Sequence, residues 1–274
     1  MVNYQMKERA SFLDLTDRVS IITGASRGIG AAAAIELAKL GSKVALLDLS
    51  LDDAKSRADE IAREHGVKAQ GYALDIRDRA KLYETITEIA REFGAIDHLI
   101  NNAGVQHVSP LESFPDDKWD FVRSIDLDGV FFAIKAVWPH MIARGRGRIV
   151  NIASVQGLVG SPFKIAYNAA KHGVVGLTKT AAIEGATLNI TVNAVCPGAV
   201  LTELIKGQAK DLQRSYGGGI TEEQALERAF LDAMPTKRFI DPEEVGQLCA
   251  FLCSEAARSI TGAPIPIDGG WVAH

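Results

Sequence analysis

The sequence predicts an α/β protein built on a doubly wound parallel sheet with helices on both faces. Short β-branched and apolar runs alternate with longer helical stretches along almost the whole chain of 274 residues. This alternation is typical of parallel strands joined by helical crossovers. A glycine-rich loop directly follows the first apolar run, and no internal repeat or low-complexity tract interrupts the order. The crossovers are expected to be right-handed.

The composition excludes several classes of protein. Hydrophobic residues make up 47% of the chain, enough for a large core, and the net charge is −4. A nucleic-acid-binding surface would need a basic excess that this chain lacks. No apolar run is long enough to span a membrane, and residues 1–14 are too polar for a signal peptide. We therefore expect a cytoplasmic protein with neither a nucleic-acid nor a membrane partner.

The three cysteines predict neither disulfides nor a metal site. Cys196, Cys249 and Cys253 are too few and too poorly spaced for a disulfide framework. Cys249 and Cys253 are four residues apart in an apolar helical stretch, where packing against the core explains them better than metal binding. No metal is expected.

The first strand leads into the glycine loop. Residues 1–15 form a short extension without periodicity, ahead of a single domain over residues 16–274. A β-branched run at Arg18–Thr23 is followed by the loop G-A-S-R-G-I-G (24–30) and an alanine-rich helix at Ala31–Leu40. Such glycines let the backbone approach a pyrophosphate, which a helix N-terminus attracts. The spacing differs from the commoner G-x-G-x-x-G, so an ordinary strand-to-helix turn is the alternative.

The second strand supplies an acidic residue at its end. Lys43–Leu47 is an apolar run followed by Asp48, about twenty residues beyond the glycine loop, where a carboxylate suits a ribose hydroxyl pair. A carboxylate there also repels the 2′-phosphate of NADP. Arg27 in the loop would attract that phosphate, but one flexible arginine is less decisive. The sequence favours NAD as the cofactor.

The alternation continues to the middle of the chain. Asn101-Asn102-Ala103-Gly104 closes the fourth strand with small residues and a side-chain amide, which suit close passage of a cofactor. The further strands are expected at Lys68–Leu74, Asp97–Ile100, Arg148–Ala153 and Thr191–Val195. The helices are expected at Leu51–His65, Arg79–Phe93, Pro115–Arg144 and Ile165–Ala186.

A polar segment over residues 200–232 breaks this rhythm. It is helical in parts and is interrupted by three glycines at 217–219. An insertion after a strand's carboxyl end is where a substrate lid would lie; an ordinary surface helical hairpin is the alternative. A helix at Asp241–Ser254 follows, with Pro242 in its first turn. Pro264 and Pro266 restrict the last strand, Ala263–Ile267, to a sheet edge.

Three residues of the central segment suit proton transfer. Ser154 follows the fifth strand, and Tyr167 and Lys171 are four apart on a predicted helix, so they share one face. An ammonium beside a phenol lowers its pKa from ~10 toward the neutral range that a general base needs. Taken alone, the Y-x-x-x-K spacing is also compatible with an ordinary solvated helix face.

Together these motifs resemble the short-chain dehydrogenases/reductases. They are Thr23-Gly24-x-x-x-Gly28-x-Gly30, Asn101-Asn102-Ala103-Gly104, Ser154, Tyr167-x-x-x-Lys171 and Pro197-Gly198. The resemblance covers nearly the whole chain after Leu15 and implies a single Rossmann-type domain, a nicotinamide cofactor and a homotetramer. It implies a cofactor site at Gly24, Ser26, Arg27, Gly28, Ile29, Gly30, Asp48, Asp75, Ile76, Asn102, Ala103, Gly104, Tyr167, Lys171, Pro197, Gly198, Val200 and Thr202.

A narrower resemblance is to the D-3-hydroxybutyrate dehydrogenase branch. The segments K-H-G-V-V-G-L-T-K (171–179), F-L-C-S (251–254) and D-G-G-W-V-A (268–273) carry it, with a glutamine in the lid. The resemblance implies that the substrate is held by Gln106, Ser154, Lys164, Gln208 and Trp271. Lys164 also makes sense unaided, because an anionic substrate of an acidic protein needs a cation in its pocket.

Three residues depart from the family pattern. Asp126 stands where the family has a relay asparagine, Gln156 where the branch has histidine, and Ala199 where it has tryptophan. We expect Asp126 to act with Ser154, Tyr167 and Lys171 in catalysis. Gln156 and Ala199 are expected at the substrate, where the smaller Ala199 would leave room for a longer or more polar molecule.

The resemblance implies an NAD-dependent oxidoreductase that interconverts a small secondary alcohol and its ketone, with a 3-hydroxy acid such as 3-hydroxybutyrate, or a somewhat larger relative, as substrate. Tyr167 would be the acid–base residue, Lys171 would lower its pKa, and Ser154 would orient the reacting oxygen. The alternatives are an oxoacyl carrier-protein reductase, a general secondary-alcohol dehydrogenase, and a non-catalytic dinucleotide-binding regulator.

Overall fold

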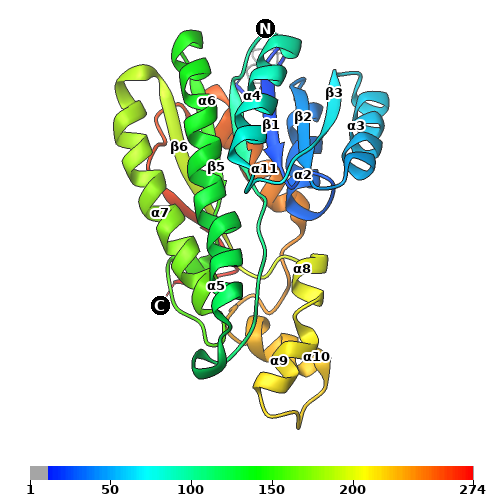
Figure 1. Ribbon diagram of the computed structural model, residues 1–274, viewed down its shortest axis with the longest axis vertical. Coiled ribbons are helices and arrows are strands. Elements are labelled where there is room, and N and C mark those ends of the chain that lie inside the picture. The colour runs from blue at the N-terminus through cyan, green and yellow to red at the C-terminus, as the bar shows by residue number, and fades with distance from the viewer. Residues whose placement is uncertain (1–11, 274) are drawn as a thin grey trace, which may run out of the picture.

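A computed structural model describes residues 12–273 and shows a seven-stranded, all-parallel sheet (Figure 1). Its order, β3-β2-β1-β4-β5-β6-β7, confirms the predicted α/β class. Strands β1 to β3 are added toward one edge of the sheet and β4 to β7 toward the other. A crevice therefore opens at the carboxyl ends of β1 and β4, where this order changes. The strands are β1 Val19–Thr23, β2 Lys43–Asp48, β3 Ala69–Ala73, β4 His98–Asn101, β5 Gly147–Ile152, β6 Ile190–Pro197 and β7 Pro264–Ile267.

Helices cover both faces of the sheet, each over its own apolar cluster (Figure 1). Helices α2, α3 and α11 pack on one face, and α4, α6 and α7 on the other. Consecutive residues of β1 point alternately into the two clusters, as period-two strand geometry requires. The main helices are α2 Gly28–Lys39, α3 Leu51–His65, α4 Arg79–Phe93, α5 Asp116–Arg123, α6 Val130–Arg144, α7 Ile165–Gly185 and α11 Pro242–Cys253.

Two helices have the predicted bounds because their ends are encoded locally. The Ser50 and Asp78 side chains accept hydrogen bonds from backbone N–H groups in the first turns of α3 and α4. Gly66 and Gly94 end these helices in left-handed conformations that a glycine adopts without strain. In contrast, α2 begins at Gly28, inside the glycine loop and three residues before the expected start.

The predicted helix over Pro115–Arg144 is divided. A π-helical turn at Ser124–Gly129 separates α5 from α6 and contains Asp126. A Cβ at Gly129 would lie 2.8 Å from the Ile76 side chain, so the turn packs closely on the end of the third strand. π-helical turns inside α-helices often occur at functional sites. Short 3₁₀ turns occur at Leu111–Ser113, Val155–Gly157, Ala186–Leu188 and Glu255–Ala257.

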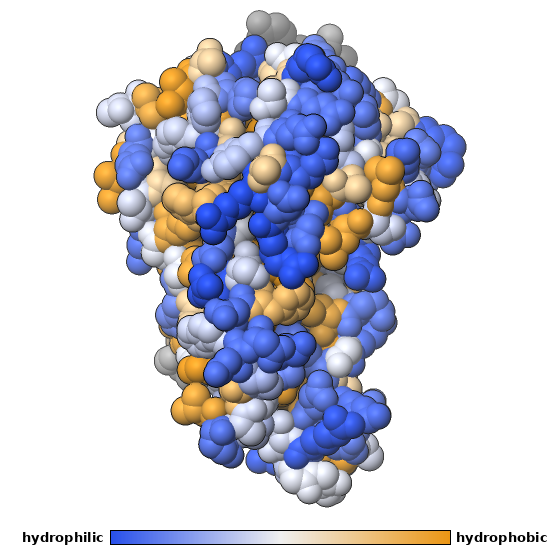
Figure 2. Space-filling model, in the orientation of Figure 1, coloured by the Kyte–Doolittle hydropathy of each residue, from blue (hydrophilic) through white to orange (hydrophobic). Residues whose placement is uncertain are grey.

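The segment after β6 forms a separate helical lobe at the bottom of Figure 1. It contains α8 Glu203–Lys206, α9 Ala209–Ser215, α10 Glu222–Leu226 and a π-helical turn at Glu227–Leu231. Gly217 and Gly218, both with positive φ, join α9 to α10. In the same orientation, Figure 2 shows hydrophobic surface between this lobe and the sheet-bearing part above it. The lobe lies where the lid over residues 200–232 was expected.

The ends of the described chain add two details. Residues 1–11 of the predicted extension lie outside the described residues, but Leu15 is buried and donates its N–H to the Leu40 carbonyl. The core therefore begins slightly before residue 16. Strand β7 lies at a sheet edge, as its prolines required. Within residues 12–273 no helix combines the length and the apolar character needed to cross a bilayer.

Candidate active site

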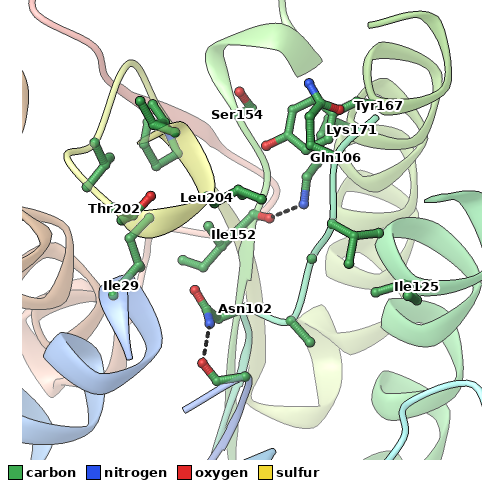
Figure 3. A pocket seen from close by; sticks show the side chains of 18 of the residues that line it. Ile29, Asn102, Gln106, Ile125, Ile152, Ser154, Tyr167, Lys171, Thr202 and Leu204 are labelled. Carbon is green, nitrogen blue, oxygen red and sulfur yellow. Dashed lines mark hydrogen bonds between the residues drawn. The ribbon is translucent and has the colours of Figure 1, made fainter. Parts of the chain in front are cut away.

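One cavity of about 390 Å³ lies at the carboxyl ends of the strands, between the sheet and the lid (Figure 3). The strand ends, the glycine loop, α7 and the lid all contribute to its wall. Of the residues predicted to bind cofactor or substrate or to act in catalysis, all line this cavity except Ser26, Gly30, Asp126 and Ala199. The fold thus gathers residues from distant parts of the sequence into one site.

The glycine loop packs directly on the end of β4. A Cβ at Gly30 would lie 2.2 Å from the Gly24 carbonyl oxygen, so any larger residue would displace the loop. Gly24 has φ +62, in the left-handed region that favours glycine. The Asn102 side chain donates hydrogen bonds to the Thr23 and Gly24 carbonyls at 3.0 and 2.9 Å. Gly30 and Asn102 therefore fix the position of the loop beside the cavity, although Gly30 itself does not line it.

The carboxylate of Asp48 is held in place at the far end of the cavity. One oxygen accepts the Ser26 backbone N–H at 2.9 Å and the other accepts the Leu49 N–H at 2.8 Å. The buried Ser26 Oγ has no hydrogen-bond partner in the described chain. Arg77 pairs with Asp75 and lowers the pKa of that carboxyl. A glycine-lined wall and a fixed carboxylate fit the pyrophosphate and ribose of a nicotinamide dinucleotide.

Ser154, Tyr167 and Lys171 meet at the other end (Figure 3). Ser154 follows β5, and its Oγ accepts the Gln156 N–H at 3.1 Å, which leaves its own O–H proton free to donate. The Lys171 Nζ donates to the Ile152 carbonyl at 3.0 Å and lies 5.3 Å from the centre of the Tyr167 ring. The fully buried ammonium is thus held beneath the phenol, as the four-residue spacing predicted.

The pKa of Tyr167 differs from the sequence-based expectation. Burial raises the pKa of this phenol above its ordinary value, and the Asp126 carboxylate adds to the rise. The Lys171 ammonium and the Ser154 hydroxyl act in the opposite direction but do not outweigh burial. The expectation of a lowered pKa is therefore wrong for the cavity as it stands. Spacing alone predicted the ammonium but not the desolvation or the opposing carboxylate.

Asp126 lies behind Lys171 and not on the cavity wall. Its Oδ2 is 3.4 Å from the Lys171 Nζ, and its Oδ1 accepts the Val105 N–H at 2.8 Å. Burial raises the pKa of the Asp126 carboxyl, against the opposing effects of Lys171 and the Val105 N–H. Among the predicted catalytic residues, Asp126 therefore contacts Lys171 alone.

A second buried lysine lines the cavity among the residues predicted to hold the substrate. Lys164 is 3% exposed, and its Nζ lies 4.1 Å from the centre of the Phe230 ring, which the lid supplies. Burial lowers the pKa of this ammonium to about 7. No carboxylate pairs with it within residues 12–273. The side-chain oxygens of Gln106, Gln156 and Gln208 are buried there without partners.

The prediction that Ala199 lies at the substrate is wrong, because Ala199 does not line the cavity. Its side chain is buried in the apolar cluster under the lid, and its carbonyl accepts the Ile240 N–H at 2.8 Å. The backbone after Gly198 turns this residue away from the cavity, so the small side chain does not enlarge the site. Trp271, in contrast, lines the cavity as expected.

The sequence analysis missed the contribution of the lid's apolar side chains. Leu204, Ile205 and Phe230 line the cavity, and Phe230 covers the ammonium of Lys164. Isolated apolar residues in an otherwise polar segment are the only sequence signal for them. That signal shows that a side chain is buried but not which residue it meets.

Comparison with known proteins places the chain in a family. The model of the short chain dehydrogenase family matches residues 18–213, which include the glycine loop and the Ser154, Tyr167 and Lys171 constellation.

The chain belongs to the short-chain dehydrogenase family.

Its relatives differ in the activities that their names give. A D-beta-hydroxybutyrate dehydrogenase of Rhizobium meliloti (strain 1021) is 42% identical over 94% of this chain and 99% of its own length. The crystal structure of levodione reductase superposes with a TM-score of 0.88 at 36% identity, covering 94% of this chain and 98% of that one. A candidate NAD(P)-dependent gluconate 5-dehydrogenase from Beutenbergia cavernae, solved with NADP at low occupancy, has a TM-score of 0.87 at 32% identity over 96% of this chain and 100% of its own.

Proposed function

We propose that this protein is an NAD-dependent dehydrogenase of small 3-hydroxy acids. Lys164 is the observation that carries the proposal: a buried lysine without a carboxylate partner faces a cavity that also contains three unpartnered glutamine oxygens. A buried charge is stable only when it is paired. A substrate carboxylate would supply the missing partner. The 42% identical D-beta-hydroxybutyrate dehydrogenase acts, by its name, on such a hydroxy acid.

The roles of the other residues follow from their positions. Tyr167 takes the proton of the substrate hydroxyl during oxidation and returns it during reduction, while the Ser154 O–H orients the reacting oxygen. Lys171 stabilises the phenolate form of Tyr167 from behind. The nicotinamide, when bound, accepts or supplies the hydride. The protein's share is to hold the reacting oxygen, move one proton and exclude water.

Asp48 supports NAD as the preferred cofactor. Both of its oxygens already accept backbone N–H groups, so the carboxylate is held in one orientation. A 2′-phosphate beside this fixed negative charge would be repelled. Arg27 and Arg77 also line the cavity, but Arg77 is engaged by Asp75.

A homotetramer is proposed for the assembled enzyme. Phe131 on α6 and Ile183 on α7 are 45% and 78% exposed, and β7 is the last strand of the sheet in the described chain. Apolar side chains and unpaired strand edges favour association. Light scattering after size-exclusion chromatography should give four times the chain mass; a monomer would contradict this part of the proposal.

The activity can be tested directly by the absorbance of NADH. The purified chain is mixed with NAD or NADP and a panel of 3-hydroxy acids, 2-hydroxy acids and neutral secondary alcohols. We expect 3-hydroxy acids with NAD to give the largest kcat/KM. A clear preference for neutral alcohols would instead favour a general alcohol dehydrogenase, and no turnover of any member would favour the non-catalytic alternative.

A further inference from the structure

The most unusual feature of the site is a carboxylate behind the catalytic lysine. Asp126 and Lys171 are both fully buried, with 3.4 Å between Oδ2 and Nζ. Gly104 leaves room for the pair, because a Cβ there would lie 3.3 Å from Oδ2 and 3.6 Å from Nζ. The π-helical turn supplies Asp126, α7 supplies Lys171, and the N-N-A-G segment supplies the glycine beside them.

Each oxygen of Asp126 has a separate role. Oδ1 accepts the Val105 N–H at 2.8 Å, whereas Oδ2 has no hydrogen-bond partner in the described chain and lies 3.4 Å from the Lys171 ammonium. A carboxylate can accept from both donors at once. An asparagine has one oxygen and one NH₂ group and can satisfy only one of them without placing two donors together. The geometry therefore places the negative charge of Asp126 directly beside the Lys171 ammonium.

We propose that Asp126 is a positioning residue whose negative charge compensates Lys171 and moves the working range of Tyr167 to higher pH. The inference depends on the proposed role of Tyr167 as acid–base residue. An isolated ammonium favours a nearby phenolate, whereas an ammonium paired with a carboxylate presents almost no net charge to it. Tyr167 consequently keeps its proton to a higher pH than it would beside an unpaired lysine.

The other groups around the phenol do not provide the same compensation. Those that face Tyr167 and Lys171 are the Ser154 hydroxyl after β5 and the Cys196 thiol on β6, with Asp268 beyond the thiol. Burial raises the pKa of Cys196 to about 11, so it is neutral at physiological pH. Asp268 accepts the Gly270 and Val272 N–H groups through its two oxygens. Asp126 is the only carboxylate in the described chain that pairs with Lys171.

The test is the pH dependence of alcohol oxidation in the Asp126→Asn variant. Removal of the charge should shift the rising limb of the kcat–pH profile to lower pH by about one unit or more, since neighbouring charges shift pKa values by ~1–3 units. A merely structural role would lower kcat at every pH without moving the limb. An unchanged limb, or one shifted to higher pH, would overturn the proposal.

Asp128→Asn is the matched control. It removes a negative charge from the same π-helical turn, but Asp128 pairs with the partly exposed Arg123. Its profile should coincide with that of the wild type. An equal shift in both variants would show an effect of net charge and would also overturn the proposal.

A direct titration of Tyr167 depends neither on a substrate nor on the folding of the Asp126→Asn variant. The absorbance of phenolate at 295 nm is followed with pH in the wild type, and the Tyr167→Phe curve is subtracted. We expect wild-type Tyr167 to titrate no lower than free tyrosine, at ~10; a lower midpoint would contradict the compensation. If Tyr167→Phe itself turns over substrate, the proposed function fails and the titration still decides the charge compensation.

Discussion

Lys171 and Lys164 are two buried lysines in one site, and their charges are controlled in opposite ways. Lys171 has Asp126 as a partner; burial alone would lower the pKa of its ammonium, but Asp126 and Tyr167 raise it above the ordinary value. Within residues 12–273 Lys164 pairs with no carboxylate and contacts the face of Phe230, and burial lowers the pKa of its ammonium to about 7. Burial alone therefore does not determine whether a lysine is protonated; the groups that contact its ammonium do.

The difference has a functional meaning. A lysine whose charge is satisfied within the protein can support another residue throughout the reaction, whereas one left unsatisfied is ready to pair with an incoming anion. The first arrangement stabilises the site and the second favours binding at the expense of stability. Replacing each lysine by methionine should therefore give opposite changes in the free energy of unfolding.

Lys171→Met should have the largest effect. The change removes the ammonium beside Tyr167 and leaves Asp126 buried without its partner; breaking one side of a buried pair costs ~3–5 kcal/mol. We expect turnover to fall by about a thousandfold or more, from the combined loss of phenolate stabilisation and of site geometry, together with a lower Tm. Stopped assays for NADH and thermal unfolding measure the two effects. Near-normal turnover would show that Lys171 has been misassigned.

Lys164→Met should stabilise the protein and weaken substrate binding. In the unfolded chain the lysine binds a proton up to pH ~10.4, but in the folded chain only up to about 7. The cost of the buried ammonium is therefore fully present below pH 7 and disappears as the pH rises through this window. Each pKa unit corresponds to ~1.4 kcal/mol, so a gain of a few kcal/mol is expected at pH 6.

Urea unfolding at pH 6 and pH 10 shows whether Lys164→Met raises or lowers the free energy of unfolding. The stability advantage of the methionine variant should be larger at pH 6 than at pH 10. A destabilised variant at pH 6 would mean that Lys164 has a partner in the folded protein. Lys135→Met, a change on the exposed surface of α6, is a useful comparison because it should show no such pH dependence.

The KM of the wild type for a hydroxy acid should also depend on pH. Only the protonated Lys164 attracts a carboxylate, and its pKa is about 7 without substrate. KM should therefore rise as the pH increases from 7 to 9, by up to about tenfold per unit. A neutral alcohol should show no corresponding rise. Equal pH dependence for both substrates would assign the effect to another group.

The sequence predicts those features of the fold and site that are set by residues close together in the chain. The bounds of α3 and α4 were predicted because Ser50, Gly66, Asp78 and Gly94 encode the helix ends within a few residues. The alternation of strands and helices and the Tyr167–Lys171 face also follow from short-range periodicity. These features need no knowledge of tertiary contacts.

The features that the sequence did not predict depend on packing between distant segments. The break between α5 and α6 accompanies the contact of Gly129 with Ile76, and Phe230 meets Lys164 only because the lid folds back toward the residue that precedes α7. The burial of Ala199 is likewise a property of the lid's core. Periodicity and motif spacing contain no information on such contacts.

Asp48→Ala should have a moderate effect confined to the cofactor. The change removes the acceptor for the Ser26 and Leu49 N–H groups and the repulsion of a 2′-phosphate. We expect the ratio of kcat/KM for NAD to that for NADP to fall by about tenfold or more, equivalent to ~1.4 kcal/mol. Most of the fall should come from weaker NAD binding, which fluorescence titration measures. A wild type that already prefers NADP would contradict the assignment.

Phe230→Leu should have the smallest effect of these changes. It retains an apolar cover over Lys164 but removes the ring, whose attraction for a cation is worth ~0.5–2 kcal/mol. Because the ring stabilises the ammonium both with and without substrate, most of this attraction cancels in KM. We expect KM for a hydroxy acid to rise by only a few fold, with little change for a neutral alcohol. A larger loss for both substrates would indicate that Phe230 shapes the cavity more than it supports the ammonium.

The most direct test of the account compares an acid with its ester. The kcat/KM for the 3-hydroxy acid that is turned over fastest is divided by that for its methyl ester, in the wild type and in Lys164→Met. A charge-assisted contact is worth ~1.5–3 kcal/mol, so the wild-type ratio should exceed the variant's by about tenfold or more, with the ester rate little changed. Equal ratios in the two proteins would contradict the claim that Lys164 selects a carboxylate substrate.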